Sequence, residues 1–268
     1  MKEAVWCRSR YWLCHFLHSR HEREPISWTV PPAGGPSPAG ASLRRWIAGV
    51  PRRSQESGAW LVATAARECA DDPAYVQCVR LLVKEQHHHD ELLRRLLERL
   101  GVALPSRPRH VGPIRRLAGW RRSTLGSRFE MSVLLLIDCI DLLMLTRLAQ
   151  TSDDPVVREV AAAITKEKRG HIGFCGERLT ALYADFNFLR RNLRRLRLRS
   201  MWMGLLLGTS WRHARLLGII GRRRRDFVAG GRRHFDALLE RMVPYRRDAV
   251  LRALRAQRSA PYAKATLP

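Results

Sequence analysis

The chain has 268 residues, of which 46% are apolar, and this is enough to bury one good hydrophobic core. Its charge is strongly positive, because 49 Lys and Arg residues outweigh 24 Asp and Glu residues to give a net charge of +25. The six cysteines form no CxxC pair, which argues against a zinc knuckle or a disulfide framework and indicates reduced thiols in a cytoplasmic protein. No apolar run reaches the length of a membrane span.

The first 53 residues are basic and include a Pro- and Gly-rich stretch, residues 31–42, of the kind found in linkers. We expect residues 1–53 to form a disordered N-terminal segment. Its first part lacks the apolar stretch and the small-residue cleavage site of a secretion signal.

From about Ser54 onward the sequence follows a helical period. We expect helices over about 54–70, 73–100, 124–150 and 154–184, because Asp-Asp-Pro at 71–73 and at 153–155 is typical of a helix start. Residues 101–123, with repeated Pro and Gly, predict a long crossover between the second and third helices. Together these features predict an all-α fold with a four-helix bundle over residues 54–185.

Beyond the bundle the composition changes to alternating Arg-rich and apolar segments. We expect residues 186–256 to form accessory Arg-rich helices that pack on the bundle, and residues 257–268 to form a disordered tail.

A repeat within the bundle carries its most informative residues. Glu85 and His89 recur 82 residues later as Glu167 and His171, and the two Asp-Asp-Pro turns are related by the same offset. Glu56 and Asp138 also correspond, so each copy has one acid in its first helix and an acid plus a histidine in its second. This arrangement predicts two helix pairs joined by the crossover.

The spacing places these acids and histidines on apolar helix faces, at alternating steps of three and four residues. A buried carboxylate must be protonated, ion-paired or bound to metal. The sequence therefore predicts a metal site, and carboxylate and imidazole ligands favour iron or manganese. The candidate ligands are Glu56, Glu85, His88, His89, Asp138, Glu167 and His171.

The second half of the bundle reads Leu-Leu-Leu-Ile-Asp138, then Asp154-Pro155, then Glu167-Lys-Arg-Gly-His171-Ile-Gly-Phe174-Cys175. This pattern resembles uncharacterised bacterial ferritin-like domain proteins of the rubrerythrin type. In that family the motif of the fourth bundle helix is Asp-Glu-x-x-His-(Ile/Val)-x-Phe-His. The likeness extends over roughly residues 54–243. It implies a ferritin-like four-helix bundle with accessory C-terminal helices and a two-metal carboxylate site.

Two residues depart from that family pattern. The ligating glutamates of the family lie three residues before each histidine, and this chain has Gln86 and Lys168 there. In the first copy the pair Glu85 and His88 would restore the family spacing, but no other register restores it in the second. An ammonium group at Lys168 would supply positive charge in place of a metal.

Three functions stay open at this point. The first is a ferritin-like oxidoreductase with a di-iron-type site, and the second is a metal-poor relative that acts as a structural or binding protein. The third is a basic helical protein that binds nucleic acid or an anionic surface, which the charge permits but the bundle motifs do not favour. The sequence also leaves assembly into a homo-oligomer open.

Overall fold

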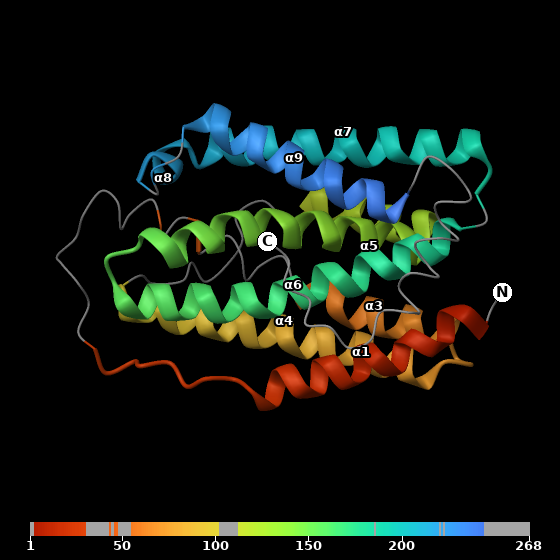
Figure 1. Cartoon of the computed structure of the whole chain (residues 1–268), viewed down its shortest axis with the longest axis horizontal. Helices are drawn as coiled ribbons and strands as arrows, with labels where there is room; N and C mark the ends of the chain where they lie inside the picture. Colours follow the sequence, from red (N-terminus) through yellow and green to blue (C-terminus); the bar gives the residue numbers. More distant parts are fainter. Residues whose placement is uncertain are drawn as a thin grey trace.

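The computed structural model describes residues 3–30, 43, 46–47, 55–101, 112–184, 186–219, 221 and 223–243. All regular secondary structure in these residues is helical, which confirms the all-α class (Figure 1). The helices are α1 (Glu3–His21), α3 (Gln55–Glu68), α4 (Pro73–Arg99), α5 (Gly112–Thr151), α6 (Pro155–Tyr183), α7 (Phe188–Arg212), α8 (Ala214–Ile219) and α9 (Arg224–Met242).

Helices α3, α4, α5 and α6 form the four-helix bundle. The repeated Asp-Asp-Pro turns begin α4 and α6 in the same way. Asp72 accepts a hydrogen bond from the amide of Tyr75 at 2.9 Å, and Asp154 accepts one from the amide of Val156 at 2.9 Å. Each aspartate thus caps a helix whose first residue is proline, where the missing amide hydrogen costs nothing.

The third bundle helix differs from expectation at its beginning. We expected an irregular crossover up to residue 123, but α5 already starts at Gly112. Gly126, with φ 69° and ψ −175°, interrupts it and separates a short helical segment from the bundle helix proper. Only glycine adopts this backbone conformation readily, so the glycine that we assigned to a helix interior is the bend. Residues 102–111 lie outside the described part of the chain.

The N-terminal segment also differs from expectation, because residues 3–21 are helical rather than disordered. Helix α1 packs along α4 and α6 (Figure 1). Its aromatic residues form an apolar face: Phe16 is fully buried, and its ring lies 5.5 Å from that of Phe174. Small residues on α6 permit the approach, since a Cβ at Gly173 would lie 2.7 Å from the Trp12 ring. The predicted linker at 31–42 lies outside the described residues.

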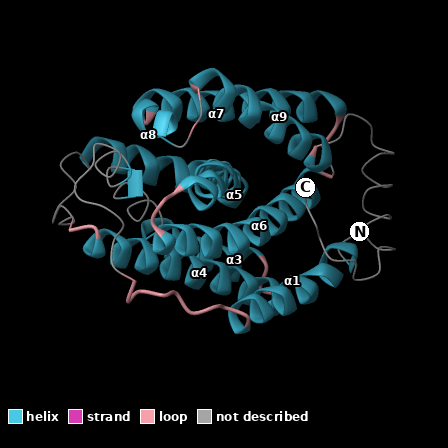
Figure 2. Cartoon of the chain, turned by 60° about the vertical axis from the view of Figure 1, so that its left-hand side comes forward, coloured by secondary structure: helices cyan, strands magenta, loops and turns pink. Residues whose placement is uncertain are grey.

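Helices α7, α8 and α9 form a further layer on the side of the bundle opposite α1 (Figure 2). Trp202 of α7 stacks on Phe235 of α9 with ring centroids 4.9 Å apart, and its indole N–H donates to the Gly231 carbonyl oxygen. The expected helix near 246–256 and the tail at 257–268 fall outside the described residues. None of the described helices combines the length and apolar content needed to cross a membrane.

Candidate functional site

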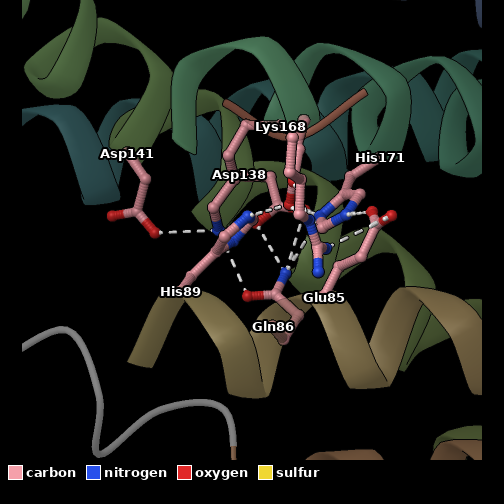
Figure 3. A network of polar contacts seen from close by, with 9 residues as sticks. Glu85, Gln86, His89, Asp138, Asp141, Lys168 and His171 are labelled. Atoms are coloured by element: carbon pink, nitrogen blue, oxygen red, sulfur yellow. Dashed lines mark hydrogen bonds and ion pairs between the residues drawn. The ribbon is translucent and has the colours of Figure 1, made fainter. Parts of the chain in front are cut away.

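The glutamates and histidines of the two repeats meet inside the bundle and pair across the repeats (Figure 3). His171 Nε2 lies 2.8 Å from Glu85 Oε2, and His89 Nε2 lies 2.7 Å from Glu167 Oε2. Each histidine therefore pairs with the glutamate of the other repeat. The two imidazole rings lie with centroids 5.5 Å apart, so the two pairs form one continuous cluster between α4 and α6.

A second group of charges lies beside these pairs and centres on Lys168. Its ammonium forms ion pairs with Asp138 and, at 3.3 Å, with Asp141, both from α5. Gln86 of α4 completes the group: its Nε2 donates to Asp138 Oδ1 at 3.2 Å, and its Oε1 accepts from Lys168 at 3.3 Å. Lys168 is only 3% exposed and Asp138 is fully buried, so this ion pair is shielded from water.

Arg23, two residues beyond the end of α1, supplies another positive charge. Its Nε donates to Glu167 Oε1 at 2.7 Å, and its terminal nitrogen lies 3.8 Å from Glu85 Oε1. The sequence analysis does not single out this residue, because it predicts a disordered N-terminal segment over residues 1–53. Nothing in its local pattern marks it, because only the docking of α1 on α4 and α6 carries it to the site.

The pairing determines the protonation states in the cluster. Burial alone would raise the pKa of Asp138, but Lys168 and His171 outweigh it and hold that pKa well below its usual range. Burial would likewise raise the pKa of Glu167, yet His89 and Arg23 lower it to about 2. Both carboxyl groups are therefore ionised at neutral pH.

The bases respond to burial in different ways. Burial would lower the pKa of Lys168, but Asp138 and Asp141 raise it, so the ammonium is retained. Burial would also lower the pKa of His171, and its hydrogen bonds to Asp138 and Glu85 raise it instead. For His89 burial dominates and lowers the pKa to about 4, so this imidazole is neutral.

Five of the seven candidate ligands meet in this cluster: Glu85, His89, Asp138, Glu167 and His171. His88 is half-buried on α4 and takes no part in the hydrogen bonds described within the cluster. Glu56 belongs to α3, but its side chain lies outside the described part of the structure. Asp141, which shares the apolar face of Asp138 in the sequence, joins the site although it was not among the candidates.

The donor set does not fit the two-metal site that the fold family implies. Divalent cations need carboxylates and imidazoles that are free to turn toward them, whereas these glutamates and histidines are paired with one another. Two side-chain cations, Lys168 and Arg23, already neutralise the acids and would repel further positive charge. Across the described residues, no group of three or more His, Cys, Asp or Glu side chains is arranged to hold a metal ion.

A cavity of about 100 Å³ adjoins the charged cluster. Its polar side is lined by Gln86, His89, Asp90, Glu130, Asp138, Asp141 and Lys168. Most of the remaining wall is apolar and comes from all four bundle helices together with Trp46: Leu61, Leu82, Val83, Leu93, Val133, Leu134, Ile137, Leu145 and Ile164. An apolar cavity with a few polar groups at one side is the usual form of a small-molecule site.

No protein-family model and no curated protein sequence matches this chain. Among solved structures, the chain is similar to a protein from Synechococcus described as having aldehyde deformylating oxidase activity. The TM-score is 0.58 at 18% sequence identity, and the match covers 82% of this chain and 98% of that one. This likeness supports the ferritin-like fold, and at this identity it supports the fold alone.

Proposed function

We propose that this protein is a metal-independent ferritin-like bundle that binds a small, largely apolar molecule in the cavity beside Lys168. The observation that carries the proposal is the position of the two side-chain cations. Lys168 lies between Asp138 and Asp141, and Arg23 contacts the two glutamates, so each of the four acids faces a cation supplied by the chain itself.

The charge balance supports a stable cluster without metal. The ionised carboxylates are opposed by Lys168 and Arg23, and His171, whose pKa is raised by its hydrogen bonds to Asp138 and Glu85, lies beside them. Each of these ionic contacts is also a hydrogen bond or lies close to one, which is the condition for burying charge at tolerable cost. In a bundle with glutamates at the positions of Gln86 and Lys168, bound metal would offset the charge of the buried acids. Here the side-chain network offsets that charge instead.

Among the groups that line the cavity, His89 offers a hydrogen-bond acceptor that defines the ligand further. Glu167 accepts hydrogen bonds from Arg23 and is ionised, so His89 Nε2 must carry the proton in the pair with Glu167. His89 Nδ1 is then a bare acceptor, and it is buried without a hydrogen-bond partner among the described residues. Because His89 lines the cavity, the group that satisfies it is a donor such as a hydroxyl.

An oxidoreductase with an iron or manganese site is the alternative. The convergence of Glu85, Glu167 and both histidines favours it, and so does the activity named for the Synechococcus protein of similar fold. This alternative requires Lys168 and Arg23 to leave the carboxylates that they now contact.

Metal content separates the two functions. We expect untagged protein, incubated with Fe(II) or Mn(II) and then desalted, to hold well below one metal per chain by elemental analysis. Lys168→Glu removes the ammonium and adds a ligand, and we expect it to raise the metal content. Lys166→Glu, at an exposed position one residue before Glu167, is the matched control and should change nothing. Two tightly bound metals per unmodified chain would overturn the metal-independent function.

The ligand class is tested with phenol and toluene, which have similar shapes but differ in the hydroxyl. We expect calorimetry to show that phenol binds at least tenfold more tightly than toluene. The preference should disappear in His89→Leu, which keeps the wall apolar and removes the acceptor. If neither compound binds the unmodified protein, or if the preference survives in His89→Leu, the proposed ligand class is wrong.

A further inference from the structure

Helix α7 exposes a row of large apolar side chains. Leu189, Leu193, Leu196, Leu207 and Trp211 are 75%, 65%, 63%, 53% and 78% exposed. They follow one another at steps of four, three, eleven and four residues, so at about 100° per residue they fall within about 60° of arc on the helix. We call these five residues the α7 stripe.

The inward face of this helix contains arginines as well as apolar residues. Arg191 and Arg195 are only 5% and 2% exposed, and Leu198, Trp202 and Leu206 are buried on the same side. Arg191 donates to the Ala184 carbonyl oxygen, and Arg195 donates to the Val243 carbonyl oxygen and to Glu240. These bonds hold α7 in the orientation that presents the stripe outward.

The charge next to the stripe is positive. Arg190 and Arg197 are exposed and lie about a quarter of a turn from its centre. The sequence of α7 contains seven arginines and no acidic residue, and the whole chain has a net charge of +25. A helix with Leu and Trp on one face and arginine beside it is typical of helices that lie in the interface of an anionic membrane.

We propose that the α7 stripe docks this protein on an anionic lipid surface, with the helix axis parallel to the membrane plane. Helix α7 belongs to the outer layer, so a flat surface can reach it without displacing the bundle (Figure 2). Ile219 of α8 is also exposed, at 45%, and Arg223 and Arg224 beyond it extend the basic character of this end.

Charge and shape favour lipid over two other occupants. A nucleic acid would pair with the arginines but would leave Leu193, Leu196 and their neighbours in contact with water or phosphate. A second copy of the chain could cover the stripe, but it would bring two strongly positive surfaces together. Acyl chains accept the leucines and anionic headgroups accept the arginines, so lipid satisfies both. This docking does not depend on what the cavity binds.

The test is flotation with vesicles of phosphatidylcholine alone and with vesicles that also contain about 30% phosphatidylglycerol, whose negative surface potential attracts basic segments. We expect the full chain to float with the anionic vesicles at low salt and to bind pure phosphatidylcholine at least tenfold more weakly. Leu193→Gln combined with Leu196→Gln should reduce flotation at least tenfold. Leu205→Gln, an exposed leucine on another side of the same helix, is the matched control and should float like the unmodified chain.

Three results would overturn the docking. One is flotation of the double variant equal to that of the unmodified chain. Another is the absence of flotation together with a dimer, seen by sedimentation, that the double variant abolishes, because the stripe would then join two copies. The third is the absence of flotation together with RNA or DNA binding that the double variant retains. Circular dichroism of each variant verifies that the helices are preserved.

Discussion

Lys168 donates a hydrogen bond to Gln86 at 3.3 Å, and the two residues occupy equivalent positions 82 residues apart in the two repeats. The neighbouring Glu and His are the same in both repeats and pair across them at 2.7 and 2.8 Å. The repeats therefore form a nearly two-fold site whose symmetry is broken at this contact. The break places a single ammonium beside Asp138, on one side of the cluster only.

Removing that ammonium should destabilise the bundle strongly. We expect Lys168→Met to lower the free energy of unfolding by about 3–5 kcal/mol, because it leaves Asp138 and Asp141 buried without their cation. Urea unfolding at pH 7 measures the effect. Lys166→Met removes an exposed lysine from the same helix and should change the free energy by less than about 0.5 kcal/mol. Equal effects of the two changes would show that Lys168 is solvated rather than paired.

The contact of Arg23 with Glu167 should stabilise both the site and the docking of α1. We expect Arg23→Met to lower the free energy of unfolding by about 2 kcal/mol, less than for Lys168 because the arginine side chain is 25% exposed. The substitution should also increase the rate of amide hydrogen exchange more in α1 than in α5. Arg10→Met, at an exposed position of α1, is the control, and an equal response there would argue against a specific role of Arg23.

Two glycines of α6 should respond to a methyl group with opposite signs, Gly173 against α1 and Gly176 against α9. At Gly173 a methyl group would meet Trp12 at 2.7 Å, so we expect Gly173→Ala to lower the free energy of unfolding by about 1–3 kcal/mol. At Gly176 the nearest atom is Met242 Sδ at 3.5 Å, an ordinary contact, and Gly176→Ala should be neutral or stabilising by up to about 1 kcal/mol. Thermal and urea unfolding measure both. Stabilisation by Gly173→Ala would mean that Trp12 does not lie against α6.

Acid should weaken the fold through His89. Its pKa is lowered to about 4 by burial, against 6.5 for an unhindered histidine, so between these pH values the unfolded chain binds a proton that the folded chain does not. The contribution of His89 to the free energy of unfolding is fully present above pH 6.5 and declines as the pH falls toward 4. From pH 7 to pH 5 the loss is about 2 kcal/mol.

The measurement is urea unfolding of the unmodified chain and of His89→Gln at both pH values. The variant should lose less stability than the unmodified chain by roughly that amount, because it lacks the titrating ring while the other ionisable groups remain. Identical losses in the two proteins would show that the pKa of His89 is the same in the folded and the unfolded chain.

The offset of 82 residues and the helical period were sufficient to predict the bundle and to bring Glu85, His89, Glu167 and His171 together, because both properties are local or strictly periodic. The Asp-Asp-Pro turns gave the starts of α4 and α6 to within one residue. Arg23 could not be predicted in the same way. Its position depends on the packing of Phe16 and its aromatic neighbours against α6, which is a long-range contact without a repeating signal.

The exchanged pairing resembles the interface of a two-fold homodimer, in which each half offers the same groups to the other. Two copies of the first repeat would bring Gln86 against Gln86 and leave the acids of the cluster without an ammonium. Two copies of the second would bring Lys168 against Lys168, with like charges side by side. Neither pairing balances, so joining two different halves in one polypeptide is what permits a single cation at the centre. The covalent link between the repeats thus ensures that each core contains one Gln86 and one Lys168, and this fixes the charge of the core.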